Sequence, residues 1–292
     1  MRYHFFRLVS VFAPRIPWRL RPFVATLVGL MAWLLARSAR AGASQNAMHV
    51  LGLTNTETRQ QRRRLRRVVQ GMFITAARNY LEVCAFSGTS PQQLLSHLMP
   101  NPDFSALDAA LAPGKGAILI SAHFGPFDYV AQCLQLHGYP LTIPVEQLSD
   151  QRMLDLMLSL RRRYGVQYVP LHGASTIRTL LQQLRARRIV LITADRVVQG
   201  SSVEVPFFNA KARLPWGPIA LALHTGTPLV GAFGWYGRDQ RIYGALVPIT
   251  LSLPEERRSD PEAIIRVVVQ LLEDYIGTYP QQWAMFTPIW LE

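Results

Sequence analysis

Residues 117–128 read Ala-Ile-Leu-Ile-Ser-Ala-His-Phe-Gly-Pro-Phe-Asp. The apolar run that opens this stretch is typical of a buried strand in a parallel sheet. Pro126 then suits the first turn of a helix, because its ring fixes φ and it has no N–H to leave unpaired. The stretch therefore predicts a strand, a turn that carries His123, and a helix that begins close to Asp128.

The same alternation of strand and helix signals continues to the end of the chain. Helical segments separate further strand candidates at residues 141–145, 166–171, 188–194 and 229–233, and residues 242–249 are predicted to form one more strand. Alternation of this kind is typical of parallel strands joined by right-handed crossover helices. We therefore expect an α/β fold with a mainly parallel central sheet flanked by helices.

His123 is the first candidate for chemistry, because open α/β sheets place their sites beyond the carboxyl ends of the strands. A histidine beside a carboxylate can take a proton from a hydroxyl and then hold the positive charge. Asp128, five residues further on, is expected to orient the ring of His123. The backbone N–H groups around Gly125 and the helix start are expected to suit an oxyanion or a phosphate. A structural role for His123 is the alternative.

Two more predicted strands end in acidic residues. Glu146 follows residues 141–145, and Asp195, with Arg196 beside it, follows the strand at 188–194. Because the carboxyl ends of parallel strands meet at one edge of a sheet, these side chains are expected to gather near His123. The alternative is that they are solvated residues without a functional role.

The positive charge of the chain lies almost entirely in its first third. Of the formal net charge of +13, residues 1–100 carry fourteen arginines against two acids, and the remainder is nearly neutral. Such asymmetry predicts an anionic partner, either a membrane or a nucleic acid. Residues 59–67 contain six arginines without an interleaved aromatic residue, which favours a membrane surface over nucleic acid. A merely solvated basic face is the alternative.

Residues 22–36 contain no charged side chain and are bordered by arginines. The segment is shorter than the roughly 20 residues that a spanning helix needs, so it is predicted to lie in one leaflet with the arginines at phosphate level. A buried helix of the domain and a single membrane span are the alternatives. We expect residues 1–100 to form membrane-associating helices packed on an α/β core at residues 101–292.

Cysteine usage and short motifs narrow the choice of chemistry. Cys84 and Cys133 form no disulfide framework and show no metal-ligand spacing, so we expect a reducing compartment and no metal site. The chain has no Gly-x-Ser-x-Gly elbow, which disfavours a serine hydrolase.

Further motifs are Arg161 four residues before a glycine, the Leu-Ile-Thr-Ala-Asp-Arg run at 191–196, and the Pro-Gln-Gln-Trp run at 280–283. Together with His123, Asp128 and Glu146, these motifs resemble the bacterial lipid A lauroyl/myristoyl acyltransferase family, and within it most closely the phosphatidylinositol mannoside acyltransferases. The match extends from the basic N-terminal segment to the C-terminal end.

The resemblance implies an α/β fold of the lysophospholipid/glycerol-phosphate acyltransferase type on the cytoplasmic face of the plasma (inner) membrane. It implies transfer of a fatty acyl group from a thioester to a glycolipid hydroxyl, with His123 as general base and Asp128 orienting it. Glu146 and Arg161 would order the acceptor head group or support the catalytic pair. Asp195 would bond acceptor hydroxyls or fix the loop around the site, and Arg196 would pair a phosphate.

No cofactor is implied, only acyl-CoA or acyl-carrier protein as co-substrate. An acyl-CoA donor with a phosphatidylinositol mannoside acceptor is the favoured combination. The alternatives are a lipid A precursor (Kdo-lipid type) acylated from acyl-carrier protein, a lipid hydrolase, and a basic membrane- or nucleic-acid-binding protein without catalysis.

Overall fold

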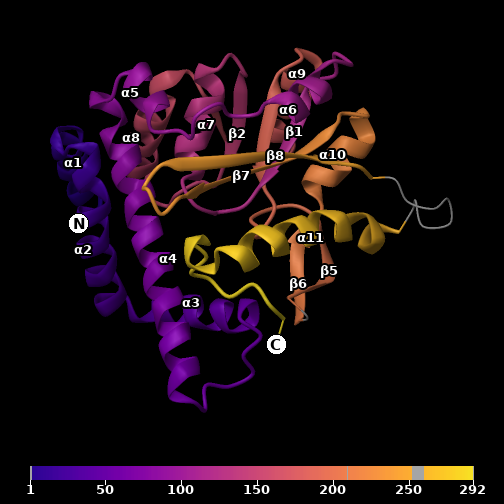
Figure 1. The fold of residues 1–292 in the computed structure, drawn as a ribbon. Coiled ribbons are helices and arrows are strands. Elements are labelled where there is room, and N and C mark those ends of the chain that lie inside the picture. The colour runs from indigo at the N-terminus through magenta and orange to yellow at the C-terminus, as the bar shows by residue number, and fades with distance from the viewer. Residues whose placement is uncertain (1, 209, 252–259, 292) are drawn as a thin grey trace.

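A six-stranded sheet forms the centre of the protein in the computed structural model, which describes residues 2–208, 210–251 and 260–291. Its strand order is β3-β2-β4-β1-β7-β8 (Figure 1). The strands are β1 (Ala117–Ser121), β2 (Leu141–Val145), β3 (Gln167–Pro170), β4 (Ile189–Thr193), β7 (Leu229–Tyr236) and β8 (Ile242–Ile249). All neighbours pair in parallel except β7 and β8. The prediction of a mainly parallel sheet is confirmed, with β8 as an antiparallel edge strand.

Helices cover both faces of the sheet, as the alternating pattern predicted. They are α6 (Ser105–Leu111), α7 (Phe127–Leu136), α8 (Gln151–Arg161), α9 (Ala174–Arg185), α10 (Gly217–Thr225) and α11 (Pro261–Thr278). Because successive strand residues point to opposite faces, Ile118 and Ile120 of β1 pack toward α9, α10 and α11. Ala117 and Leu119 pack toward α6, α7 and α8. Burial on both faces explains the continuous apolar run of β1.

A separate hairpin, β5 (Ser202–Phe207) with β6 (Ala210–Pro215), lies beside α11 (Figure 1). α11 runs toward α4 (Arg59–Ala85), and the chain then turns through η6 (Pro280–Gln282) beside α4 and runs back below α11 toward β6 (Figure 1). The indole N–H of Trp290 donates to the carbonyl of Phe207 at 2.9 Å, which ties this end of the chain to the hairpin. The same return path places Trp283 against Phe124, in the segment that follows β1, where the two residues form an antiparallel bridge.

The first hundred residues form α1 (Arg2–Phe12), α2 (Arg21–Leu35), α3 (Arg37–Val50), α4 (Arg59–Ala85) and α5 (Pro91–Ser96). Figure 1 shows α2 running alongside the long helix α4 at one flank of the molecule. Gly29 allows this close approach, because a Cβ there would lie 2.6 Å from the Cα of Ile74. α2 therefore buries one narrow face against α4.

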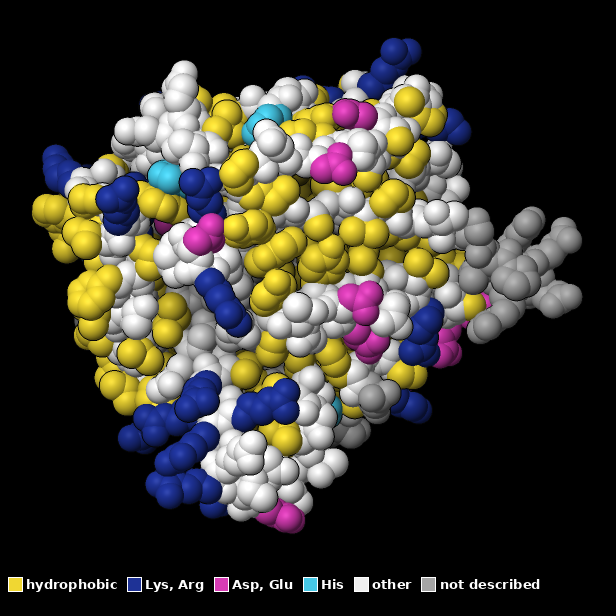
Figure 2. All heavy atoms as spheres, in the orientation of Figure 1, with side chains coloured by type: hydrophobic (Ala, Val, Ile, Leu, Met, Phe, Trp, Pro, Cys, Tyr) yellow, Lys and Arg dark blue, Asp and Glu magenta, His cyan; other side chains and the backbone are white. Residues whose placement is uncertain are grey.

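The opposite face of α2 is exposed and apolar, so the alternative of a fully buried helix is wrong. Its exposed side chains include Phe23, Leu27, Met31, Leu34 and Leu35, and α1 adds Phe5, Leu8 and Phe12. By length and composition alone, Trp18–Leu35 is also long and apolar enough to cross a membrane. Figure 2 shows hydrophobic side chains along this flank and Lys and Arg side chains grouped below it, where α4 begins.

Candidate active site

The site is built where β1 and β4 end side by side. The two strands pair in parallel with Ser121 opposite Thr193. His123 and Asp195 each stand two residues beyond that last pair, so the register brings them together. The Nδ1 atom of His123 lies 2.9 Å from Oδ1 of Asp195, and the backbone N–H of His123 donates to Oδ2 of Asp195, also at 2.9 Å.

Asp195 is held by a third donor from the far end of the chain. The indole N–H of Trp283 donates to Oδ2 of Asp195 at 2.8 Å, and the Asp195 side chain has no solvent exposure. A buried carboxylate costs free energy unless it is paired and hydrogen-bonded, and these donors provide that pairing. The carboxylate is therefore fixed in position before any substrate binds.

The electrostatics of this pair favour an ionised acid beside a titratable base. Burial alone would lower the pKa of His123, but the charge and hydrogen bond of Asp195 outweigh it, and the pKa is raised from its usual value. Burial alone would raise the pKa of Asp195, but the charge of His123 and the hydrogen bonds from His123 and Trp283 lower it. No described residue bonds to Nε2 of His123, which leaves that atom for a substrate.

The expectation that Asp128 orients His123 does not hold in this structure, because Asp195 occupies that place. Asp128 is buried and its Oδ2 accepts hydrogen bonds from Arg161 at 2.8 Å and from Asn79 at 3.1 Å. α7 begins at Phe127, so Asp128 stands in its first turn and faces α4 and α8. Within the described chain, no hydrogen bond joins Asp128 to His123.

The N–H of Gly125 is not available to an anion, contrary to the expectation for that residue. It donates to the carbonyl of Gln282 at 2.8 Å. Gly125 has φ of +53°, and a Cβ there would lie 2.1 Å from the carbonyl oxygen of Gly234. The glycine is therefore needed for a left-handed turn packed against β7, and this turn sets the path of the loop that carries His123.

Glu146 and Arg196 form an ion pair beside the catalytic candidates. Glu146 follows β2 and Arg196 follows Asp195, so the order of β2, β4 and β1 in the sheet brings both close to His123. Their side chains are partly exposed, with 47% and 28% of their surface accessible. The prediction that ionisable groups gather at this sheet edge agrees with the contacts.

A cavity of about 770 Å³ opens in front of these residues. His123, Asp128, Glu146, Arg161 and Arg196 line its polar wall. The rest of its lining is mainly apolar and includes Leu148, Met153, Met157, Ile177, Leu180, Leu191 and Leu221. The volume lies within the range of small-molecule sites, and the mixed lining suits a molecule with a long apolar part and a polar reacting end.

The protein matches the family model described as bacterial lipid A biosynthesis acyltransferase over residues 6–292. The chain belongs to this family. It is 32% identical over 191 residues to the phosphatidylinositol mannoside acyltransferase of Mycobacterium tuberculosis (strain CDC 1551 / Oshkosh). The aligned region covers 63% of this chain and 58% of that protein. It is 29% identical over 194 residues to the same-named protein of Mycolicibacterium smegmatis (strain ATCC 700084 / mc(2)155), covering 65% and 61%. The matches thus span about three fifths of these relatives.

The resemblance noted from the motifs is therefore confirmed at the level of the family. For this family member, the structure adds two residues that the sequence reasoning did not place in the site. Trp283, named from the sequence only as the end of the Pro-Gln-Gln-Trp run, donates a hydrogen bond to Asp195; that run was the available signal. Asn79 bonds Asp128 from the middle of α4, and nothing in its local sequence marks it.

Proposed function

We propose that the protein transfers a fatty acyl group from an acyl thioester, with acyl-CoA as the favoured donor, to a hydroxyl of a glycolipid such as a phosphatidylinositol mannoside. The observation that carries the proposal is the 2.9 Å contact between Nδ1 of His123 and Asp195 beside a large, mainly apolar cavity. Membership of an acyltransferase family and the two mannoside-acylating relatives support the choice of reaction and acceptor.

In this reaction His123 acts as general base through Nε2. It takes the proton of the acceptor hydroxyl as the hydroxyl oxygen attacks the thioester carbonyl, and Asp195 stabilises the resulting imidazolium. The tetrahedral oxyanion then collapses, the carbon–sulfur bond breaks, and the departing thiolate receives the proton from His123. A thioester is already activated, so the step needs no metal or nucleotide.

The oxyanion needs donors close to His123. α7 begins directly after the His123 turn, and the first N–H groups of a helix have no carbonyl of an earlier turn to bond. The backbone N–H groups of Phe127 and Asp128 therefore replace Gly125 as the proposed donors. The positive end of the helix dipole favours the same charge.

The apolar and polar parts of the cavity lining suit different parts of the two substrates. The acyl chain lies against the apolar lining, where each buried CH₂ contributes about 0.8 kcal/mol. The acceptor head group lies at the rim, where Glu146 and Arg196 supply a hydrogen-bond acceptor and a cation. Arg161 presents a second guanidinium in the lining of the same cavity.

The apolar flank of α1 and α2 is proposed to dock on the cytoplasmic face of the inner membrane, with the exposed arginines of α4 near lipid phosphates (Figure 2). Tyr80 connects this flank with the site: it lines the cavity and makes an edge contact with Phe6 of α1, 5.4 Å between ring centroids. A lipid acceptor would then reach His123 from the membrane surface.

Thiol release from palmitoyl-CoA tests the proposal, measured with a phosphatidylinositol mannoside, with a Kdo-lipid precursor and without acceptor. Mass spectrometry of the lipids identifies the acylated product. Release that requires the mannoside and is absent in His123→Ala supports the proposal. Equal release without any acceptor would indicate a hydrolase, and activity with the Kdo-lipid alone would move the acceptor to lipid A precursors. With no release from palmitoyl-CoA, acyl-carrier protein becomes the donor to examine.

A further inference from the structure

Asn79 of α4 lies behind the cavity wall and contacts the buried acid of the site. It is 3% exposed, and its Nδ2 donates to Oδ2 of Asp128 at 3.1 Å. The same carboxylate oxygen accepts Nη2 of Arg161 at 2.8 Å. One carboxylate oxygen thus accepts two hydrogen bonds, one from a neutral amide of α4 and one from a charged guanidinium of α8.

Asn79 itself does not reach the cavity. Its neighbour Tyr80 is part of the cavity lining, as are Asp128 and Arg161, whereas Asn79 is not among the lining residues described. The hydrogen bond to Asp128 therefore connects Asn79 with the cavity lining. Burial lowers the pKa of Arg161, but Asp128 outweighs that effect and the pKa is raised, so the guanidinium at the wall stays charged.

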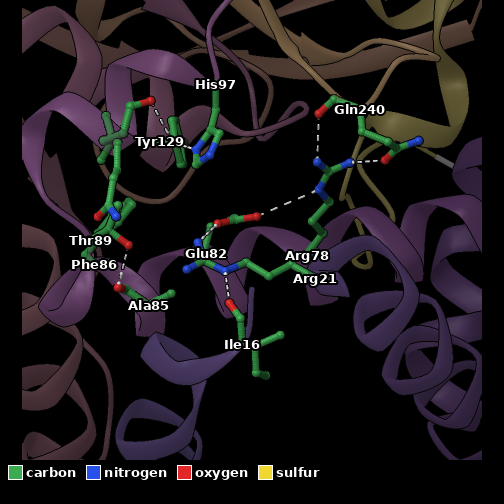
Figure 3. A network of polar contacts seen from close by, with 12 residues as sticks. Ile16, Arg21, Arg78, Glu82, Ala85, Phe86, Thr89, His97, Tyr129 and Gln240 are labelled. Carbon is green, nitrogen blue, oxygen red and sulfur yellow. Dashed lines mark hydrogen bonds and ion pairs between the residues drawn. The ribbon is translucent and has the colours of Figure 1, made fainter. Parts of the chain in front are cut away.

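Two buried anchors fix this part of α4, as Figure 3 shows. Glu82 accepts a hydrogen bond from Nη1 of Arg21 in α2 at 2.7 Å. Arg78 donates from Nη1 to Oε1 of Gln240 at 2.8 Å and from Nη2 to the carbonyl of Gln240 at 3.0 Å. Gln240 lies in the turn between β7 and β8. The rotation of α4 about its axis is therefore set on both sides of Asn79.

We propose that Asn79 is a positioning residue: it holds the Asp128 carboxylate so that Asp128 keeps the Arg161 guanidinium at the wall of the cavity that His123 also lines. The inference deepens the proposed acyltransferase function and rests on it. An amide suits this task because it donates without adding charge. A carboxylate at this position would repel Asp128, a cation would compete with Arg161, and an apolar side chain would leave the buried oxygen with one donor fewer.

Two substitutions test the role, with Thr89→Val as the matched control. Asn79→Leu keeps the size and removes the donor. Thr89 is also buried and lies just beyond α4, where its hydroxyl bonds only the carbonyl of Ala85 among the described residues, at 2.9 Å. We expect Asn79→Leu to lower kcat/KM by about 10- to 100-fold, the scale of a small misplacement of a reacting group. Thr89→Val should keep the wild-type value, with melting temperatures recorded for all variants.

Asn79→Asp gives a readout that a purely structural role would not move. While protonated, the new carboxyl can donate to Asp128 as the amide does; once ionised, it repels Asp128. The ratio of kcat/KM between Asn79→Asp and wild type should therefore fall as pH rises from 5 to 8. Because the charge of Asp128 raises the pKa of His123, a new charge beside Asp128 acts on His123 as well. The pKa of His123 is therefore fitted separately in each protein before the ratio is taken.

The position of Arg161 can also be followed without turnover. Phenylglyoxal modification of the Arg161 peptide, measured by mass spectrometry, should be several-fold faster in Asn79→Leu than in wild type and unchanged in Thr89→Val. Equal modification rates, or wild-type kcat/KM in Asn79→Leu with a flat pH ratio in Asn79→Asp, would overturn the role of Asn79. A wild type that is inactive with both palmitoyl-CoA and acyl-carrier protein donors, with faster Arg161 modification in Asn79→Leu, would contradict the proposed reaction and leave the positioning contact supported.

Discussion

His123 and Asp195 each stand two residues beyond the last paired residues of β1 and β4, and their side chains meet at 2.9 Å. The strand register thus builds the pair directly: two adjacent parallel strands end together, and the next turns carry a base and an acid. The turn of His123 is held from behind by Gly125, and Asp195 is held by Trp283. Three separate parts of the chain thus contribute to the pair: the segments after β1 and β4, and Trp283 near the C-terminal end.

The first prediction concerns the pair itself. Asp195→Asn keeps the shape of the side chain but removes the charge that stabilises the imidazolium, so we expect kcat to fall by about 10³-fold or more. The kcat of His123→Ala should be lower than that of wild type by about the same factor, since the base is lost. Thiol release from palmitoyl-CoA measures both, with circular dichroism as the folding control. Substantial activity in Asp195→Asn would mean that another group orients His123.

The pH profile follows from the raised pKa of His123. The base must be neutral to accept a proton, so kcat/KM should rise with pH and level off only above the ordinary histidine value of 6.5. In Asp195→Asn the raising charge is gone while burial remains, so the residual activity should level off at lower pH. A profile recorded from pH 5 to 9 for both proteins checks this. A midpoint that is the same in the two proteins would contradict it.

Asp128 should act differently from Asp195. Asp128→Asn leaves the Arg161 guanidinium without its countercharge; breaking a buried pair in this way costs about 3 kcal/mol. We expect a clear loss of unfolding free energy in urea and a partial loss of activity. Asp195→Asn should instead lose almost all activity. Equal stabilities of Asp128→Asn and wild type would show that the ion pair with Arg161 contributes little.

The anchor between α2 and α4 predicts a pH-dependent stability. Burial raises the pKa of Glu82 to about 6, although Arg21 and Arg78 oppose that effect. A raised pKa means that the folded protein holds the proton more tightly, so this contribution is present below pH 4.5 and lost as pH rises through 6. Its size is about 2 kcal/mol or less. Partly buried His97, whose pKa is lowered to about 4, titrates over the same range in both proteins. The difference in unfolding free energy between wild type and Glu82→Gln, measured in urea at pH 4.5, 5.5 and 6.5, should therefore decline as pH rises.

The apolar flank predicts membrane binding that depends on named side chains. Phe23→Ser with Met31→Ser removes two exposed side chains of α2, and each buried apolar side chain contributes about 1.5–3 kcal/mol. We therefore expect at least tenfold weaker binding to vesicles of phosphatidylglycerol and phosphatidylcholine, measured by co-sedimentation. Leu223→Ser changes an exposed residue of α10, away from this flank (Figure 1), and should bind like wild type. Equal binding of all three proteins would exclude α2 as the docking element.

The sequence by itself determined the elements and the edge of the sheet where the site lies. Local periodicity and turn chemistry depend on consecutive residues, so the sequence alone reveals them. They define the apolar run 117–121, the helix start near Asp128, and the strands that end before Glu146 and Asp195. The parallel sheet follows from their alternation. The motif His123 with Asp128, read locally, led to a pairing that the structure replaces.

Only the tertiary structure decided which acid meets His123. Asp128 is five residues away but faces α4 and α8 because it sits in the first turn of a helix. Asp195 is 72 residues away and lies within hydrogen-bond distance because β4 pairs with β1. Only the tertiary structure likewise shows that Trp283 bonds Asp195, that Asn79 bonds Asp128, and that the turn of Gly125 packs against β7. Periodicity shows where a strand ends, but its neighbours follow from how all the strands and helices bury their apolar faces together.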